Sequence, residues 1–126
     1  MVSRAEVLMG RDKAFPLDEE QERNLEHLLE CLNKFRVLFG RPMTVSSGYR
    51  PAAINAKVKG AAKRSNHISC LACDFKDVDG YLANWCLKNL DKLEQCGLFL
   101  ESPAHTPGWT HLQAVPPKSG NRVFLP

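Results

Sequence analysis

Residues 18–40, DEEQERNLEHLLECLNKFRVLFG, carry the clearest structural signal in the chain. Asp18 can cap a helix, and the glutamates that follow it suit the positive end of the helix dipole. Apolar residues then recur at helical spacing up to Gly40, a residue type that commonly ends helices. These apolar residues are Leu25, Leu28, Leu29, Leu32, Phe35 and Phe39. The stretch therefore predicts one long amphipathic helix.

The segments after this helix alternate between strand and helix patterns. Strands are predicted at the start of residues 43–50 and over 70–78, 98–102 and 109–115, and helices from Pro51 to Gly60 and over 80–95. The Pro-rich loop between the last two strands makes them an antiparallel pair. The sum predicts an α+β domain with helices packed on one face of a small, mostly antiparallel sheet.

Length and composition point to one domain over residues 1–126. A chain of this size can bury a core of its own, and no repeat or linker divides it. No stretch approaches the ~20 apolar residues of a membrane helix, and charges from Arg4 onward break the apolar run that a secretory signal needs. Five cysteines without the spacing of a small secreted domain favour reduced thiols. We expect a soluble monomer, made in the cytoplasm without a signal peptide.

Lys57, Lys59, Lys63 and Arg64 gather within eight residues, although the net charge is only +3. A solvated loop is the simplest interpretation, and attraction to an anionic polymer is the alternative. Nucleic acid is a poor candidate for that polymer, because no aromatic residue is interleaved with these charges to stack on bases.

Three of the four histidines lie near predicted strand ends. His67 precedes one strand, His111 lies in another, and His105 lies in the loop before it, whereas His27 falls on the outer side of the long helix and receives no role. With Asp74, seven residues after His67, the set contains two histidines and one carboxylate. Such a set holds zinc at three positions and leaves a fourth for water, as in catalytic sites. A structural role for each histidine is the alternative.

Cys70 and Cys73 form a C-x-x-C that suggests a rival metal site. A structural zinc site needs a second ligand pair, and the other cysteines contain no second C-x-x-C. In a strand, residues three apart also point to opposite faces. A redox motif would begin a helix, whereas this segment is predicted to be a strand. We therefore interpret both cysteines as strand residues.

The segments VSSGYRP (45–51), SNHISCLACDF (65–75) and GWTHLQ (108–113), with Asn55, resemble a known family. It contains the zinc D-alanyl-D-alanine carboxypeptidases, L-alanyl-D-glutamate endopeptidases and related phage endolysins, which cut peptidoglycan stem peptides and share the hedgehog fold. The resemblance covers nearly the whole chain and is closest to the compact phage branch. It implies a Zn²⁺ cofactor, a peptidoglycan stem peptide as partner, and three zinc ligands, His67, Asp74 and His111.

Two positions depart from the family pattern. Cys70 stands where the family usually has glycine, and Gly108 stands where many members carry an acidic catalytic base, three residues before His111. Without that base, another group must accept the proton. We expect Glu101 to do so, because it ends a strand that can pair with the metal-binding strand, and the phage branch has a Glu before its Trp-x-His. A surface strand end is the alternative.

The resemblance also suggests roles for other polar residues. Arg50 would hold a substrate carboxylate or stabilise an oxyanion, and His105 is the reserve choice for protonating the leaving amine. Ser47, Tyr49 and Ser65 are expected to orient these groups or the substrate. A structural role in a turn, or simple exposure at the surface, is the alternative for each residue.

The function that follows is hydrolysis of an amide bond in a stem peptide, of the D,D-carboxypeptidase or L,D-endopeptidase type. The protein would reach the cell wall through a holin or as a component of a virion. A second class stays open because of Gly108: a zinc-stabilised cell-wall-binding or virion structural module with weak or no turnover.

Overall fold

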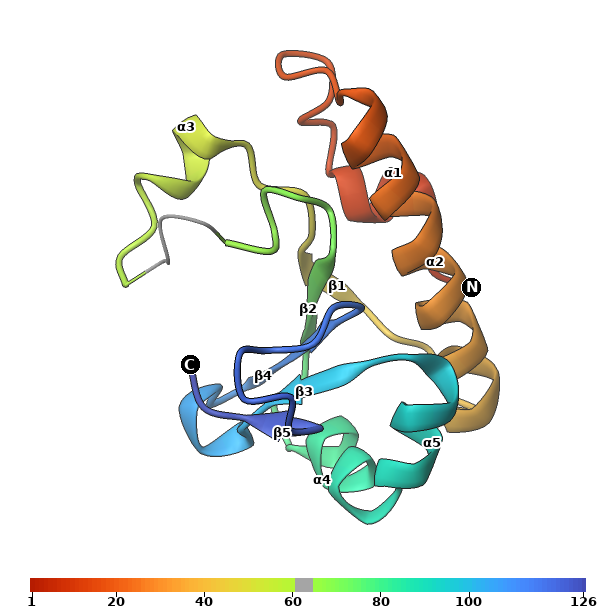
Figure 1. The fold of residues 1–126 in the computed structure, drawn as a ribbon. Coiled ribbons are helices and arrows are strands. Elements are labelled where there is room, and N and C mark those ends of the chain that lie inside the picture. The colour runs from red at the N-terminus through yellow and green to blue at the C-terminus, as the bar shows by residue number, and fades with distance from the viewer. Residues whose placement is uncertain (61–64) are drawn as a thin grey trace.

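Five strands form one sheet in the order β1-β2-β4-β3-β5 in the computed structural model, which describes residues 1–60 and 65–126 (Figure 1). They are β1 (Val45–Ser47), β2 (Ala72–Lys76), β3 (Phe99–Glu101), β4 (Trp109–Gln113) and β5 (Val123–Phe124). The neighbours pair antiparallel except for β3 and β5, which run parallel. The predicted α+β class, with its mostly antiparallel sheet, is confirmed, as is the antiparallel pairing of β3 with β4. The two-residue strand β5 was not predicted.

The helices are α1 (Arg4–Leu8), α2 (Glu19–Phe39), α3 (Ala52–Asn55), α4 (Tyr81–Lys88) and α5 (Leu90–Cys96), with a 3₁₀ turn, η1 (Pro103–His105). The long helix predicted from residues 18–40 is confirmed as α2. Asp18 accepts from the Gln21 amide while the Gln21 side chain accepts from the Asp18 amide, and Gly40 closes the helix at φ 75°. Within the described part of the chain, no helix is long and apolar enough to cross a membrane.

Two predicted helices have different bounds in the structure. The single helix predicted over 80–95 is wrong, because Asn89 leaves the helical conformation and divides it into α4 and α5. The Asn89 side chain donates to the Trp85 carbonyl oxygen, which is how asparagine competes with helical hydrogen bonds. Likewise, α3 ends at Asn55, so Gly60 does not terminate it.

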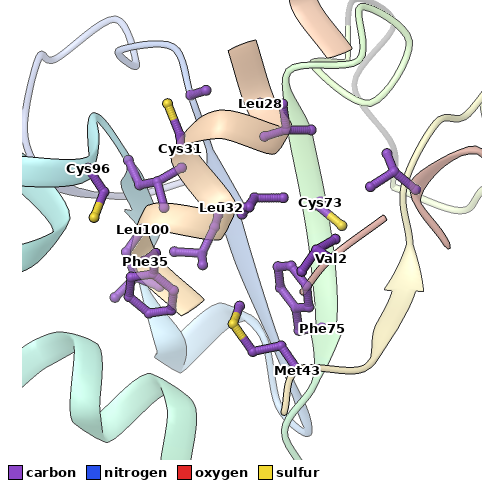
Figure 2. Close-up of a cluster of buried hydrophobic side chains, with 14 of the residues drawn as sticks. Val2, Leu28, Cys31, Leu32, Phe35, Met43, Cys73, Phe75, Cys96 and Leu100 are labelled. Carbon is purple, nitrogen blue, oxygen red and sulfur yellow. The ribbon is translucent and has the colours of Figure 1, made fainter. Parts of the chain in front are cut away.

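Side chains of β2 alternate between the core and the opposite face of the sheet. Cys73 and Phe75 point into the core, where they meet the buried side of α2, including Leu28, Leu32 and Phe35 (Figure 2). Because side chains alternate along a strand, Asp74 points to the other face. In Figure 1, α2 and α5 lie on one side of the strands and α3 lies on the other. The face that bears Asp74 is therefore turned away from the long helix.

The cysteines lie in the protein interior. All five are free and buried, and burial raises the pKa of the Cys70 thiol to about 12. The predicted strand 70–78 begins only at Ala72, and Cys70 has a left-handed φ of 62° outside it. The prediction that Cys70 and Cys73 face opposite sides of one strand is therefore wrong. Their burial and raised pKa values still disfavour a thiolate metal site.

Asp77 ties the start of α4 to the sheet. Its carboxylate accepts hydrogen bonds from the Leu82 and Ala83 amides, at 2.9 and 2.8 Å, and from the Thr110 hydroxyl at 2.8 Å. All four residues are buried.

Asp77→Ala is expected to lower the free energy of unfolding by on the order of 3 kcal/mol, because it leaves three buried donors without this acceptor. Urea denaturation would measure the change. Asp79→Ala is the matched control, because Asp79 is exposed and its carboxylate accepts only from the Tyr81 amide in the described structure. Equal losses for the two variants would contradict the role assigned to Asp77.

Candidate metal centre

Three side chains meet on the face of the sheet opposite the core. Asp74 lies in β2 and His111 lies directly opposite it in β4, in antiparallel register. His67 comes from the turn that precedes β2. All three are buried, and one candidate ligand atom from each lies within 4.8 Å of the others. This group could hold a metal ion, and it contains the residues expected from the sequence.

The Asp74 carboxylate lies between the two imidazoles. Its Oδ2 is 3.3 Å from His67 Nε2, and its Oδ1 is 2.8 Å from His111 Nδ1. The far nitrogen of His67, Nδ1, is 2.9 Å from the carbonyl oxygen of Gly48. A carbonyl oxygen can only accept, so Nδ1 carries the proton and the neutral ring presents a lone pair at Nε2.

This arrangement fits a divalent metal. A lone pair on His67 Nε2 faces a carboxylate oxygen at 3.3 Å, and two acceptors at that distance require a proton or a cation between them. A metal-ligating histidine commonly donates its other ring N–H to a backbone carbonyl, as His67 does to Gly48. Two imidazole nitrogens and one carboxylate are a donor set suited to zinc, with a further coordination position open.

Opposing effects set the charges of the group. Burial raises the pKa of Asp74, but its close contacts with His111 and His67, which favour the charged carboxylate, outweigh burial and bring the pKa down to about 2. Burial lowers the pKa of His111, and its contacts with Asp74 more than offset this, so that the His111 pKa is raised. The carboxylate is therefore held in its charged form, which is the form that binds metals.

A cavity of about 640 Å³ opens over this group. Its lining contains His67, Asp74 and His111 together with Ser47, Arg50, Lys59, Ser65, Glu101, His105, Trp109, Gln113 and Phe124. Polar and charged side chains thus surround the candidate ligands, with Trp109 and Phe124 as aromatic walls. Lys59 brings part of the basic cluster to the rim, and Lys63 and Arg64 lie outside the described residues.

Glu101 reaches this cavity from the strand next to β4. Phe99 and Leu100 pair with Gln113 and Leu112, so the next pair in the same register would be Glu101 and His111. Glu101 is half-buried, and burial raises its pKa, while the nearby His111 opposes the shift. A carboxylate with a raised pKa is a better proton acceptor near neutral pH.

Arg50 lines the same cavity. Its backbone amide donates to the His67 carbonyl oxygen at 3.1 Å, which places it beside the first histidine. Burial lowers the pKa of its guanidinium, although the Asp74 charge opposes this. Its buried Nε has no hydrogen-bond partner within the described residues. An incompletely paired guanidinium in a cavity is suited to a carboxylate ligand.

The other predicted site residues divide into two groups. Ser47, Ser65 and the exposed His105 line the cavity, and the Ser65 hydroxyl accepts from the His67 amide at 3.1 Å. Tyr49 does not line it, because its ring is buried and its hydroxyl donates to the Phe15 carbonyl oxygen. His27 is exposed on α2, as predicted.

Gly108 has a conformational reason to be glycine. Its φ is 82°, a left-handed value that side chains adopt only with strain, and its carbonyl oxygen accepts from the Asp77 amide at 3.0 Å. An acid at this position would strain the turn into β4. The turn therefore favours glycine here. Glu101 instead brings a carboxylate to the cavity from the end of β3.

Three residues of the site were not predicted from the sequence. Gly48 supplies the carbonyl acceptor for His67, Gln113 contacts the far nitrogen of His111, and the Phe124 ring lies 6.1 Å from the His111 ring, edge to face. The two-residue period of β4 could have indicated Gln113, because it shares a face with His111. Phe124 lies in β5, after a loop whose sequence does not indicate that the chain pairs with β3 again.

Two histidines and one carboxylate beside an open cavity are an arrangement that metal-dependent hydrolases use. A family model of peptidase M15 matches residues 4–113, so the chain belongs to the peptidase M15 family. Peptidases of this family are zinc-dependent, and the match confirms the family resemblance seen in the sequence. No curated protein and no solved structure matches the chain significantly.

Proposed function

We propose that this protein is a zinc peptidase that hydrolyses an amide bond in the stem peptides of peptidoglycan. The observation that carries the proposal is the convergence of His67, Asp74 and His111 at the floor of a cavity that also contains Glu101 and Arg50. Bound zinc would supply Lewis-acid polarisation of the scissile carbonyl and would lower the pKa of a water molecule.

The chain's own residues divide the remaining work. Glu101, with a pKa raised by burial, accepts the proton of the attacking water. Arg50 holds a substrate carboxylate or stabilises the negative charge that develops on the carbonyl oxygen. His105, exposed at the cavity mouth, can protonate the leaving amine.

The cavity also suits the proposed substrate class. Peptidoglycan stem peptides carry free carboxylates, and Arg50 and Lys59 bring positive charge to the cavity. Ser47 and Ser65 add hydrogen-bonding groups beside the metal ligands. In the same proposal, the protein acts as a phage-type lysin that reaches the wall through a holin or within a virion.

Removal of the metal is expected to abolish hydrolysis and to lower thermal stability. Dialysis against a chelator should stop amine release from purified cell walls, and added zinc should restore it. A ligand at 100 times its Kd stabilises the folded state by about 2.7 kcal/mol, so zinc should also raise the melting temperature. Hydrolysis that persists in metal-free protein would contradict the proposal.

Mass spectrometry of the fragments released from sacculi would identify the bond that is cut. A released terminal D-alanine indicates carboxypeptidase action, and an internal cleavage indicates endopeptidase action. If zinc-loaded protein binds walls but releases no amines, the protein is instead a zinc-stabilised binding or virion module.

A further inference from the structure

We propose that Gln113 is a positioning residue that fixes which nitrogen of His111 is available to the metal; the proposal rests on the metal site proposed above. Gln113 lies two residues after His111 in β4, so both side chains are on the same face of the sheet. It is buried, with 3% of its surface exposed. Its partner in the antiparallel register with β2 is Ala72.

The hydrogen bonds of Gln113 form a chain with one consistent direction. The Gln113 Nε2 lies 2.9 Å from the Val115 carbonyl oxygen, which can only accept, so the amide NH₂ group must face Val115. The amide oxygen Oε1 therefore faces His111, where it lies 2.8 Å from Nε2. The orientation of the amide follows from the backbone and does not depend on telling oxygen from nitrogen.

The same logic continues into the imidazole. Because Gln113 Oε1 is an acceptor, His111 Nε2 must carry a proton and donate it. In the neutral ring, Nδ1 then holds the lone pair, and Nδ1 is the nitrogen that lies 2.8 Å from Asp74. Gln113 therefore fixes the proton of His111 on Nε2, as the Gly48 carbonyl oxygen fixes the proton of His67 on Nδ1. The nitrogen left free to bind a metal is Nδ1 in His111 and Nε2 in His67.

This assignment explains a buried amide for which the peptidase mechanism has no other use. Without an acceptor at Nε2, the ring could place its proton on Nδ1, where it would bond to Asp74 and block metal binding. It could also rotate about its side-chain bonds. Loss of an outer hydrogen-bond partner of a metal ligand typically lowers metal affinity about 10- to 100-fold.

Two substitutions separate the acceptor of Gln113 from its donor. Gln113→Met has similar length but neither group, whereas Gln113→Glu keeps an acceptor for His111 and loses the amide donor to Val115. Zinc affinity would be measured by competition with a chromophoric chelator. We expect Gln113→Met to bind zinc about 10- to 100-fold more weakly than wild type, and Gln113→Glu to stay within a few-fold of wild type.

The proton position gives a second readout, independent of activity. Long-range ¹H–¹⁵N spectra of zinc-loaded wild type should show His111 with its proton on Nε2 and its metal bond at Nδ1. Equal zinc affinity for wild type and Gln113→Met would overturn the proposal, and so would a Gln113→Glu variant as weak as Gln113→Met. A His111 proton found on Nδ1 would also overturn it.

The experiment distinguishes this proposal from the proposed function. If wild type binds no zinc, the metal site itself fails. The spectrum of metal-free protein at alkaline pH, where the ring is neutral, then still decides whether Gln113 holds the proton of His111 on Nε2.

Discussion

Glu101→Gln is expected to lower the turnover number for stem-peptide hydrolysis by about 10²- to 10⁴-fold. Glutamine keeps the shape of the side chain and its place at the end of β3, but it cannot accept a proton from water. Because Glu101 is not one of the three candidate ligands, zinc content should remain that of wild type. The measurement is kcat on a defined stem peptide, together with zinc per chain.

A matched control for this variant is Glu94→Gln. Glu94 lies exposed on α5 and does not line the cavity. Its replacement removes the same charge and should leave kcat unchanged. Undiminished hydrolysis by Glu101→Gln would mean that another group is the base. If Glu101→Gln loses its zinc as well, Glu101 acts through the metal site rather than on water.

Asp74→Asn is expected to abolish stoichiometric zinc binding, with an affinity loss larger than the roughly 100-fold upper range for outer hydrogen-bond partners. Asparagine preserves the size of the side chain but removes the charge that faces both histidines. The fold should persist, because Asp74 points away from the core formed by its neighbours Cys73 and Phe75. Elemental analysis of dialysed protein would measure zinc, and circular dichroism would report the fold.

Asp79→Asn provides the comparison for Asp74→Asn. Asp79 is an exposed acid five residues further along the chain, and its replacement should leave one zinc bound. A folded Asp74→Asn variant that retains one zinc after dialysis would contradict the assignment of Asp74 as a ligand. Loss of zinc from the control would show that the assay responds to net charge alone.

Much of the fold was predictable because its signals are local. The long helix α2 has a capping box, a terminal glycine and a helical apolar period, and all three lie within residues 18–40. The break at Asn89 was missed because the apolar period continues through it, while the side-chain hydrogen bond to Trp85 is a detail of conformation. Strand β5 was missed because two residues are too few to show a two-residue period.

The candidate site divides in the same way. His67, Asp74 and His111 were identified from their residue types and from the family resemblance, and the register of β2 with β4 brings Asp74 and His111 together. The roles of Gly48 and Gln113 were not predictable, because one acts through a backbone carbonyl and the other through the direction of an amide. Neither property is visible in a sequence pattern.

The loop that contains Gly48 packs directly against α1. A Cβ atom at Gly48 would lie 2.1 Å from the Val7 carbonyl oxygen, and that oxygen accepts from the Tyr49 amide at 2.8 Å. The first helix therefore supports the loop that orients His67, while Gln113 supports His111 about a hundred residues later. No short fragment contains both supports, so a competent metal centre requires the first helix and the last long strand of the same folded chain.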